Sequence, residues 1–146
     1  PVLKHALSML QNNKYVPDFV YLLQPTSPLR TVDEIINTHT LMQTGKYNGI
    51  VTVTKYNYKI PLVLGKNNKI FFLNKSDPSK RRQDFGKLYK VTGSIYAYKT
   101  GFLLSMKNHL FEKKVFGFVA SGLTSIDIDT NEDLKIAEAL LKNKQK

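Results

Sequence analysis

The sequence contains no cysteine, which excludes disulfide bonds and metal sites built from thiolates. It also has no apolar run near the roughly 20 residues that a membrane-spanning helix needs, so we expect no membrane partner. Residues 1–13 have the pattern of an amphipathic helix without the apolar block of a signal peptide, which makes the cytoplasm the default location. A glycine-rich loop of the kind that binds phosphate is missing as well.

Basic residues outnumber acidic ones, with 22 Lys and Arg against 11 Asp and Glu and a formal net charge of +11. Such a balance attracts anionic partners, which include nucleotides as well as nucleic acids. The lysines are scattered, however, and neither an RNA-binding strand motif nor a helix-turn-helix is visible. We therefore expect no nucleic-acid partner, and a basic nucleic-acid-binding module is only our third hypothesis about function.

Local patterns predict an α/β chain with a partly parallel sheet flanked by helices, long enough for a single domain over residues 1–146. The continuous apolar run 19–23 is typical of a central strand that is covered on both faces. A β-branched stretch, 49–54, forms the next strand, after a helix that begins with a capping box of Thr31 and Glu34. This order predicts a right-handed strand–helix–strand unit whose two strands form a parallel pair. Further strands are expected at 91–98 and 115–119, and a last helix is expected to bury Leu134, Ala137, Leu140 and Leu141.

A hairpin and a long polar excursion interrupt this pattern. Apolar residues 62–64 and 70–73 flank an Asn-rich turn, which is a hairpin signal. Residues 74–90 are polar and basic and have no buried pattern of their own. Because such an arm has little core unless it packs on another subunit, we expect residues 60–90 to form a dimerisation arm of a homodimer.

A rigid polar loop follows the first strand. Two prolines three residues apart stiffen it, and its polar side chains are Gln24, Thr26, Ser27 and Arg30. The loop lies at the carboxyl end of a buried strand, where open α/β sheets bind ligands. Proline and serine there also suit turn chemistry that needs no ligand. Gln24, a polar residue at the end of a buried strand, is harder to explain in that way.

Two carboxylates near the end of the sequence form a second candidate site. Asp127 and Asp129 are two positions apart in a segment expected to be extended, which puts both side chains on one face. Carboxylates placed in this way repel each other unless a cation lies between them, and Mg²⁺ suits such ligands. The alternative is that one of them supports the start of the last helix. The spacing alone does not decide between the two.

Several motifs together resemble the CMP-sialic acid synthetases, or acylneuraminate cytidylyltransferases. Residues 22–30 read Leu-Leu-Gln-Pro-Thr-Ser-Pro-Leu-Arg, which looks like the signature of that family. A second match is Ser-Ile-Asp-Ile-Asp-Thr at 125–130, and a weaker third is Arg-Arg-Gln-Asp at 81–84 followed by Gly-Ser-Ile-Tyr at 93–96. The resemblance runs from about residue 2 to residue 141. It implies a nucleotidyltransferase-like (Rossmann-like) fold and a reaction in which an acidic nine-carbon sugar attacks the α-phosphate of CTP and releases pyrophosphate.

The resemblance also implies roles for individual residues. Asp127 and Asp129 are implied to be the catalytic pair that holds Mg²⁺ on the triphosphate, and Gln24 is implied to face the sugar. Residues implied to shape the floor of the site are Thr26, Ser27 and Arg30. Tyr96 matches the tyrosine of the family's Asn-Gly-Ala-hydrophobic-Tyr stretch, in which this chain has Thr92 in place of asparagine.

The predicted arm contributes further candidates for the sugar site. Arg81, Arg82 and Gln83 form a cluster that is commonly no more than a solvated charge run. The planar fork of arginine nevertheless suits the carboxylate of a sialic acid. The resemblance implies that an arginine from this region reaches the sugar site of the neighbouring subunit. Lys59 is a weaker candidate for the same pocket.

The family begins with a strand and a basic, glycine-containing loop for CTP, and this sequence contains no such segment. We therefore expect the chain to correspond to the carboxyl-terminal part of the family's domain and to lack CTP binding on its own. The strand at 19–23 is expected to have an open edge that another chain fills. The alternative function is a non-catalytic dimerisation and sugar-binding fragment. Legionaminic and pseudaminic acids are as compatible with the motifs as sialic acid.

Overall fold

The computed structural model describes residues 2–56, 62–64, 66, 70–72, 87–106 and 115–144. The chain divides into two compact units, one made of Pro1–Thr54 with Val91–Lys146 and the other of Lys55–Lys90. The helices are α1 (Val2–Asn12), α2 (Val32–Gln43), α3 (Thr100–Ser105) and α4 (Asn131–Lys144). The strands are β1 (Phe19–Leu22), β2 (Gly49–Lys55), β3 (Leu62–Leu64), β4 (Ile70–Phe72), β5 (Tyr89–Lys99) and β6 (Val115–Val119).

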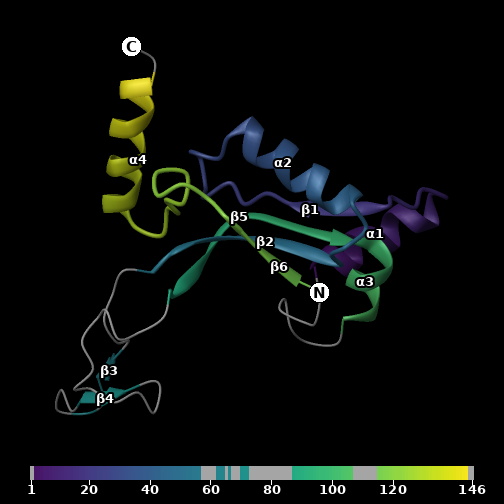
Figure 1. Ribbon diagram of the computed structural model, residues 1–146, viewed down its shortest axis with the longest axis horizontal. Helices are drawn as coiled ribbons and strands as arrows, with labels where there is room; N and C mark the ends of the chain where they lie inside the picture. Colours follow the sequence, from purple (N-terminus) through teal and green to yellow (C-terminus); the bar gives the residue numbers. More distant parts are fainter. Residues whose placement is uncertain are drawn as a thin grey trace. The chain divides into compact units, whose positions relative to one another are not determined.

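Four strands form one mixed sheet in the order β1-β5-β2-β6 (Figure 1). β1 and β5 are antiparallel, with Phe19 opposite Lys99, whereas β2 and β6 are parallel, with Gly49 opposite Val115. The predicted partly parallel sheet with flanking helices is therefore confirmed. The predicted direct pairing of the first two strands is wrong, because β5 lies between β1 and β2. A crossover helix such as α2 can also join two strands that have another strand between them, although neighbouring strands are the commoner case.

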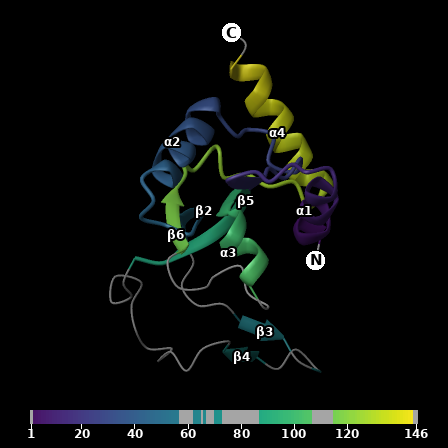
Figure 2. The ribbon, with the colours of Figure 1, turned by 90° about the vertical axis from the view of Figure 1, so that its right-hand side faces the viewer.

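Helices cover both faces of this sheet (Figure 2). One apolar cluster joins α1 and α3 to the sheet through Leu7, Val51 and Leu103. The other joins α2 to the sheet through Met42 and Ile50. Successive residues of a strand point to opposite faces, so adjacent residues of β2 contribute to different clusters. The two clusters anchor the sheet from both sides, and the loops that follow its strands are fixed as a result.

β1 is an edge strand within the part of the chain that the structure describes, where it pairs with β5 alone. All four of its residues are half-buried. The sequence predicted that this strand is central in the sheet. Among the described residues it is instead at the edge. That another chain covers the open edge of β1 stays a prediction.

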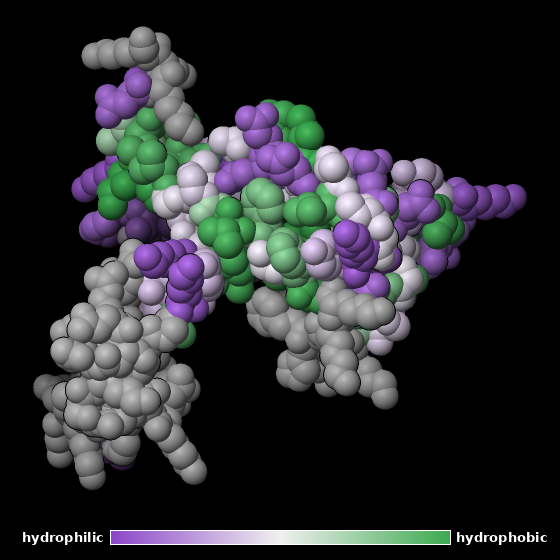
Figure 3. Space-filling view, in the orientation of Figure 1, coloured by the Kyte–Doolittle hydropathy of each residue, from purple (hydrophilic) through white to green (hydrophobic). Residues whose placement is uncertain are grey.

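α4 begins with a capping contact between Thr130 and Asp133, but its apolar residues are less covered than expected. Asp133 Oδ2 accepts hydrogen bonds from the backbone N–H and the hydroxyl of Thr130 at 2.8 and 2.7 Å. Ala137 is buried, whereas Leu134 and Leu141 are 43% and 39% exposed, so the prediction of a fully buried stripe is wrong for these two. Figure 3 shows the resulting hydrophobic surface over α4.

The unit Lys55–Lys90 contains the predicted hairpin. β3 and β4 pair antiparallel, with Leu62 opposite Phe72, which confirms the hairpin signal. Most of the predicted arm 60–90 lies outside the described residues, and so do its candidates Lys59, Arg81, Arg82 and Gln83.

Among the helices of the described residues, none has the length and apolar character to cross a membrane.

Candidate active site

The two strongest sequence motifs meet in space. The loop after β1 and the loop before α4 are joined by a backbone hydrogen bond from Ile128 N–H to the carbonyl of Thr26, at 2.8 Å. A side-chain bond adds to it: Ser27 Oγ donates to Asp127 Oδ1 at 3.3 Å. Ser27 is almost fully buried, with 2% of its surface exposed. Asp127 is thus held against the polar loop that the sequence identified separately.

Gly93 of β5 is the point at which both loops touch the sheet. Its φ of +76° lies in the left-handed region that favours glycine. A Cβ at this position would overlap Gln24 Oε1 and would lie 3.2 Å from Asp127 Oδ2. Gly93 is therefore a point of close approach, and the side chains of Gln24 and Asp127 face the same residue.

A buried pair of threonines holds the backbone around Gly93. Thr52 Oγ1 accepts hydrogen bonds from the hydroxyl of Thr92 at 2.8 Å and from the backbone N–H of Ile95 at 2.9 Å. Both threonines are buried, with 0% of Thr52 and 4% of Thr92 exposed. Thr92 takes the place of the asparagine in the family that the sequence resembles. Its hydroxyl is bonded within the sheet. Within the described residues the buried hydroxyl of Ser94 has no hydrogen-bond partner.

The side chain of Arg30 belongs to the same site, where it donates hydrogen bonds to two backbone carbonyls. Its Nε donates to the carbonyl of Ser94 at 2.7 Å, and its Nη2 donates to the carbonyl of Gln24. Burial lowers the pKa of the guanidinium, whereas the nearby Glu34 carboxylate raises it. Arg30 is therefore a link between the polar loop and β5.

Glu34 has a second structural role that its capping position does not reveal. Its Oε2 accepts from the backbone N–H of Thr31 at 3.1 Å, and the N–H of Glu34 donates back to Thr31 Oγ1 at 3.2 Å, which confirms the predicted capping box. Its Oε1 also accepts from the hydroxyl of Thr124. Both Glu34 and Thr124 are buried, at 8% and 6% exposed. The start of α2 is thereby tied to the loop that leads to Asp127.

Tyr96 of β5 lies close enough to Asp127 to respond to its charge. Burial raises the pKa of the Tyr96 phenol, and the Asp127 carboxylate raises it further. The phenol, which is protonated at neutral pH as tyrosines ordinarily are, can act as a hydrogen-bond donor. Deeper in the sheet, burial and then Tyr96 raise the pKa of Tyr98 to about 12.

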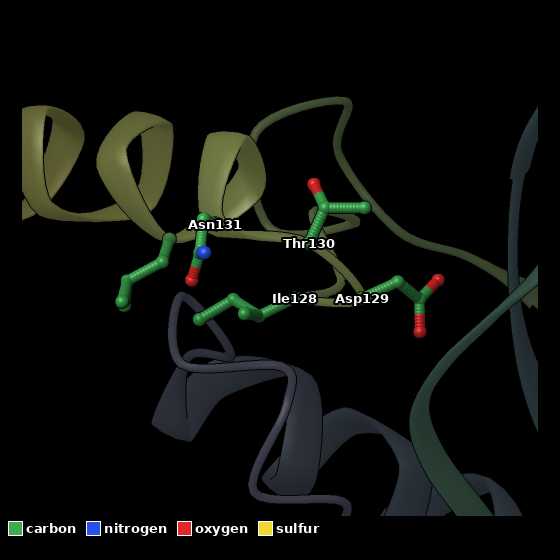
Figure 4. A pocket seen from close by; sticks show the side chains of 5 residues that line it. Ile128, Asp129, Thr130 and Asn131 are labelled. Carbon is green, nitrogen blue, oxygen red and sulfur yellow. The ribbon is translucent and has the colours of Figure 1, made fainter.

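Asp129 has different surroundings from Asp127. It is exposed and lines an open surface pocket of about 370 Å³ at the start of α4, together with Ile128, Thr130, Asn131 and Leu134. Figure 4 shows its carboxylate pointing away from Ile128 and Asn131. In the described residues no group of three or more His, Cys, Asp or Glu side chains lies together in a way that could hold a metal. Any ion at this site would therefore depend on the two aspartates and on other oxygen ligands.

Solved structures with the same fold come from enzymes of nucleotide chemistry. The 4-diphosphocytidyl-2C-methyl-D-erythritol synthase of Anaerococcus prevotii matches 93% of this chain and 65% of its own, with a TM-score of 0.59 and 17% identity. A CMP:2-keto-3-deoxy-manno-octonic acid synthetase, solved with CTP, matches 97% of this chain and 68% of its own, with a TM-score of 0.59 and 15% identity. The chain therefore has the predicted nucleotidyltransferase-like fold.

Curated proteins similar to this chain include two sugar cytidylyltransferases. The pseudaminic acid cytidylyltransferase of Campylobacter jejuni is 26% identical over 97% of this chain, and the post-translational flagellin modification protein B of Campylobacter coli is 29% identical over 99%. The N-acylneuraminate cytidylyltransferase of Escherichia coli is 31% identical over 99%. The resemblance to the acylneuraminate cytidylyltransferases is thereby confirmed. No family model matches the sequence.

The chain is shorter than each of these relatives. It spans 61% and 62% of the length of the two Campylobacter proteins and 34% of the length of the Escherichia coli protein.

Proposed function

We propose that the protein acts as a cytidylyltransferase that activates an acidic nine-carbon sugar of the N-acylneuraminate type with CTP, giving a CMP-sugar and pyrophosphate. One observation carries this proposal: Gln24 Oε1 and Asp127 Oδ2 both lie against Gly93. The residue that the resemblance assigns to the sugar and one of the two that it assigns to the metal therefore share a site. The names of two relatives, a pseudaminic acid and an N-acylneuraminate cytidylyltransferase, support the same reaction class.

In this reaction the side chains of the polar loop and of β5 bind and orient. The amide of Gln24 both donates and accepts hydrogen bonds, which suits the hydroxyls of a sugar. Ser27 fixes one oxygen of Asp127 and so sets the direction of the other. The phenol of Tyr96, which lies close enough to Asp127 for that carboxylate to raise its pKa, is available as a donor. Thr26 and Arg30 hold the polar loop against the loop before α4 and against β5 through backbone contacts.

Asp127 and Asp129 are the residues that would hold Mg²⁺. Their carboxylates, with Gln24 Oε1 beside Asp127, are hard oxygen donors. Mg²⁺ in nucleotide sites commonly uses one or two carboxylates together with substrate phosphates and water, so this donor set fits the ion. When bound, the ion would offset the negative charge that develops on the phosphates of CTP.

We propose further that the protein is a homodimer built partly by residues 60–90, and that the arm of one subunit completes the sugar site of the other. The resemblance and the polar, basic pattern of this stretch support the proposal. Residues proposed for the shared part of the sugar site are Lys59, Arg81, Arg82 and Gln83.

We propose a cytoplasmic location because CTP is made there, and we propose neither a nucleic acid nor a membrane as a partner.

The test is release of pyrophosphate by the protein translated from the complete gene, with CTP, Mg²⁺ and N-acetylneuraminate, pseudaminic acid or legionaminic acid. We expect release with at least one acid, and none when the sugar is omitted or CTP is replaced by UTP. The acid with the highest kcat/KM identifies the substrate. Failure of all three acids contradicts the proposal. If an acid nevertheless binds in calorimetry, the non-catalytic sugar-binding fragment becomes the better description.

A further inference from the structure

Three separate segments make up the candidate site: the polar loop after β1, the stretch of β5 around Gly93, and the loop before α4. Two charged residues at the start of α2 connect them. Arg30 bonds to the first two segments, through the carbonyls of Gln24 and Ser94. Glu34 bonds to the third, through the hydroxyl of Thr124. Asp127, which accepts from Ser27, links the first and third segments directly, and Arg30 and Glu34 support this link from the start of α2.

The bonding of Arg30 distinguishes it from a residue that binds substrate. Guanidinium groups that recognise a carboxylate or a phosphate direct two parallel N–H groups at the ligand. Here Nε and Nη2 are already engaged by two different carbonyls, and one of them belongs to Gln24 itself. Arg30 therefore holds the backbone carbonyl of the residue whose side chain faces Gly93.

Glu34 has the corresponding role for Asp127. Its buried carboxylate accepts from Thr31 on its own helix and from Thr124. Thr124 is three residues before Asp127, and Ile128, the residue after Asp127, is bonded to Thr26. The Glu34 carboxylate also lies close enough to Arg30 to raise the pKa of its guanidinium, so the two links are coupled by charge.

We propose that Arg30 and Glu34 are positioning residues, which together set the separation between the Gln24 amide and the Asp127 carboxylate without touching the substrate themselves. The geometric part of this inference stands on the contacts alone. Its consequence for sugar binding rests on the proposed function.

The first experiment needs no ligand. In ¹³C,¹⁵N-labelled chain, Arg30→Lys keeps the charge but replaces the fork with a single ammonium group, which cannot serve both carbonyls in the same way. Because Pro25 follows Gln24, no backbone amide reports on the Gln24 carbonyl, so the carbonyl ¹³C signals of Gln24 and Ser94 are measured directly. We expect both to shift, and the side-chain amide signals of Gln24 to shift with them.

Glu34→Gln is the second variant, and Asp33→Asn is its matched control. Asp33 lies in the same first turn of α2 but is exposed. We expect Glu34→Gln to move the Thr124 and Ile128 amide signals and to speed hydrogen exchange at Ile128 by about tenfold, the effect of roughly one weakened hydrogen bond. Asp33→Asn should leave both signals unchanged. Unchanged Gln24 side-chain signals in Arg30→Lys, or an unchanged Ile128 amide in Glu34→Gln, would overturn the proposal.

The second experiment separates positioning from direct contact. Binding of N-acetylneuraminate is titrated in four forms: the wild type, Arg30→Lys, Gln24→Ala and the double variant. If Arg30 acts through Gln24, Arg30→Lys alone weakens binding by about tenfold but adds less than about twofold once Gln24 is alanine. An additional tenfold loss in the double variant would mean that Arg30 contacts the sugar. If the wild type binds no sugar, the sugar assignment fails while the carbonyl signals still decide the positioning role.

Discussion

Ser27 and Asp127 are 100 positions apart in the sequence, and the hydroxyl of Ser27 donates to the carboxylate of Asp127 at 3.3 Å. Ser27 is buried at the end of the polar loop, so this bond fixes one oxygen of Asp127 from the protein side. The other oxygen, Oδ2, faces Gly93 and the Gln24 amide. An ordinary turn serine thereby orients the carboxylate that the proposed reaction needs most.

Asp127→Asn and Asp129→Asn test the carboxylate pair in the protein from the complete gene. Each should lower Mg²⁺-dependent pyrophosphate release by about 100-fold or more, the size expected when one preorganised electrostatic contact to the transition state is lost. The unfolding temperature should stay near that of the wild type, because neither carboxylate lies in an apolar cluster. Glu138→Gln on the exposed side of α4 is the control for loss of one negative charge. A double variant with near-normal turnover would remove the pair from the mechanism.

Gly93→Ala tests the contact between the two loops and the sheet. The left-handed φ costs a residue with a Cβ about 1–2 kcal/mol. The new methyl group also collides with the Gln24 amide. We expect a loss of at least about 1–2 kcal/mol in the free energy of unfolding, measured with urea, and a displaced Gln24 side chain.

Gly101→Ala is the matched control for this substitution. Gly101 lies in α3, and a Cβ there would have no atom within 4 Å. Alanine in a helix is favoured over glycine by roughly 0.5–1 kcal/mol, so this variant should be slightly more stable than the wild type. Equal urea midpoints for Gly93→Ala and the wild type would show that the loops adapt freely around Gly93.

The local parts of the fold were predictable because they depend on short-range chemistry. The capping box of Thr31 and Glu34, the β1 strand and the hairpin of β3 and β4 all follow from residues a few positions apart. The strand order was not predictable, because the insertion of β5 between β1 and β2 is decided by contacts between distant segments. Gly49 illustrates this: its missing side chain leaves space for the ring of Tyr98, and nothing near Gly49 in sequence indicates that neighbour.

The candidate site was predictable in its members but not in their arrangement. The motifs identified Gln24, Ser27 and Asp127, which the structure brings together. The resemblance grouped Arg30 with the residues that shape the floor of the site, and the sequence does not show the two carbonyls that it binds. Thr124 carries no local signal at all, since its role exists only through Glu34. Helical periodicity likewise showed which side of α4 is apolar but not whether a neighbour covers it.

The raised pKa of Tyr98 predicts a late step in alkaline titration. A tyrosine whose pKa is raised on folding to about 12 keeps its proton in the folded state while the unfolded state loses it near the usual value. The folded state then binds more protons between about pH 10 and 12, so the free energy of unfolding must fall as pH rises through this window. Below it the contribution is fully present.

Tyrosinate absorbance at increasing pH measures this step. The chain has eight tyrosines, and we expect one of them to ionise only as the protein approaches pH 12 or unfolds. Tyr98→Phe should remove that late step and should flatten the fall of the urea midpoint between about pH 10 and 12. Tyr15→Phe, at an exposed tyrosine, is the control. A late step that persists in Tyr98→Phe would assign it to another tyrosine.

The last prediction concerns the outer edge of β1. Within the described residues only β5 pairs with this strand, and an unpaired backbone group that is also shielded from water costs about 1–3 kcal/mol. Several such groups would be comparable with the whole stability of a small domain, so we expect another segment, from a second chain, to pair with this edge. Along an edge strand alternate N–H groups face outward. At low concentration alternate amides of residues 19–22 should therefore exchange quickly and the others slowly, and the fast ones should slow as the chain associates in sedimentation experiments. Four equally protected amides in a strict monomer would mean that the edge is already covered within one chain.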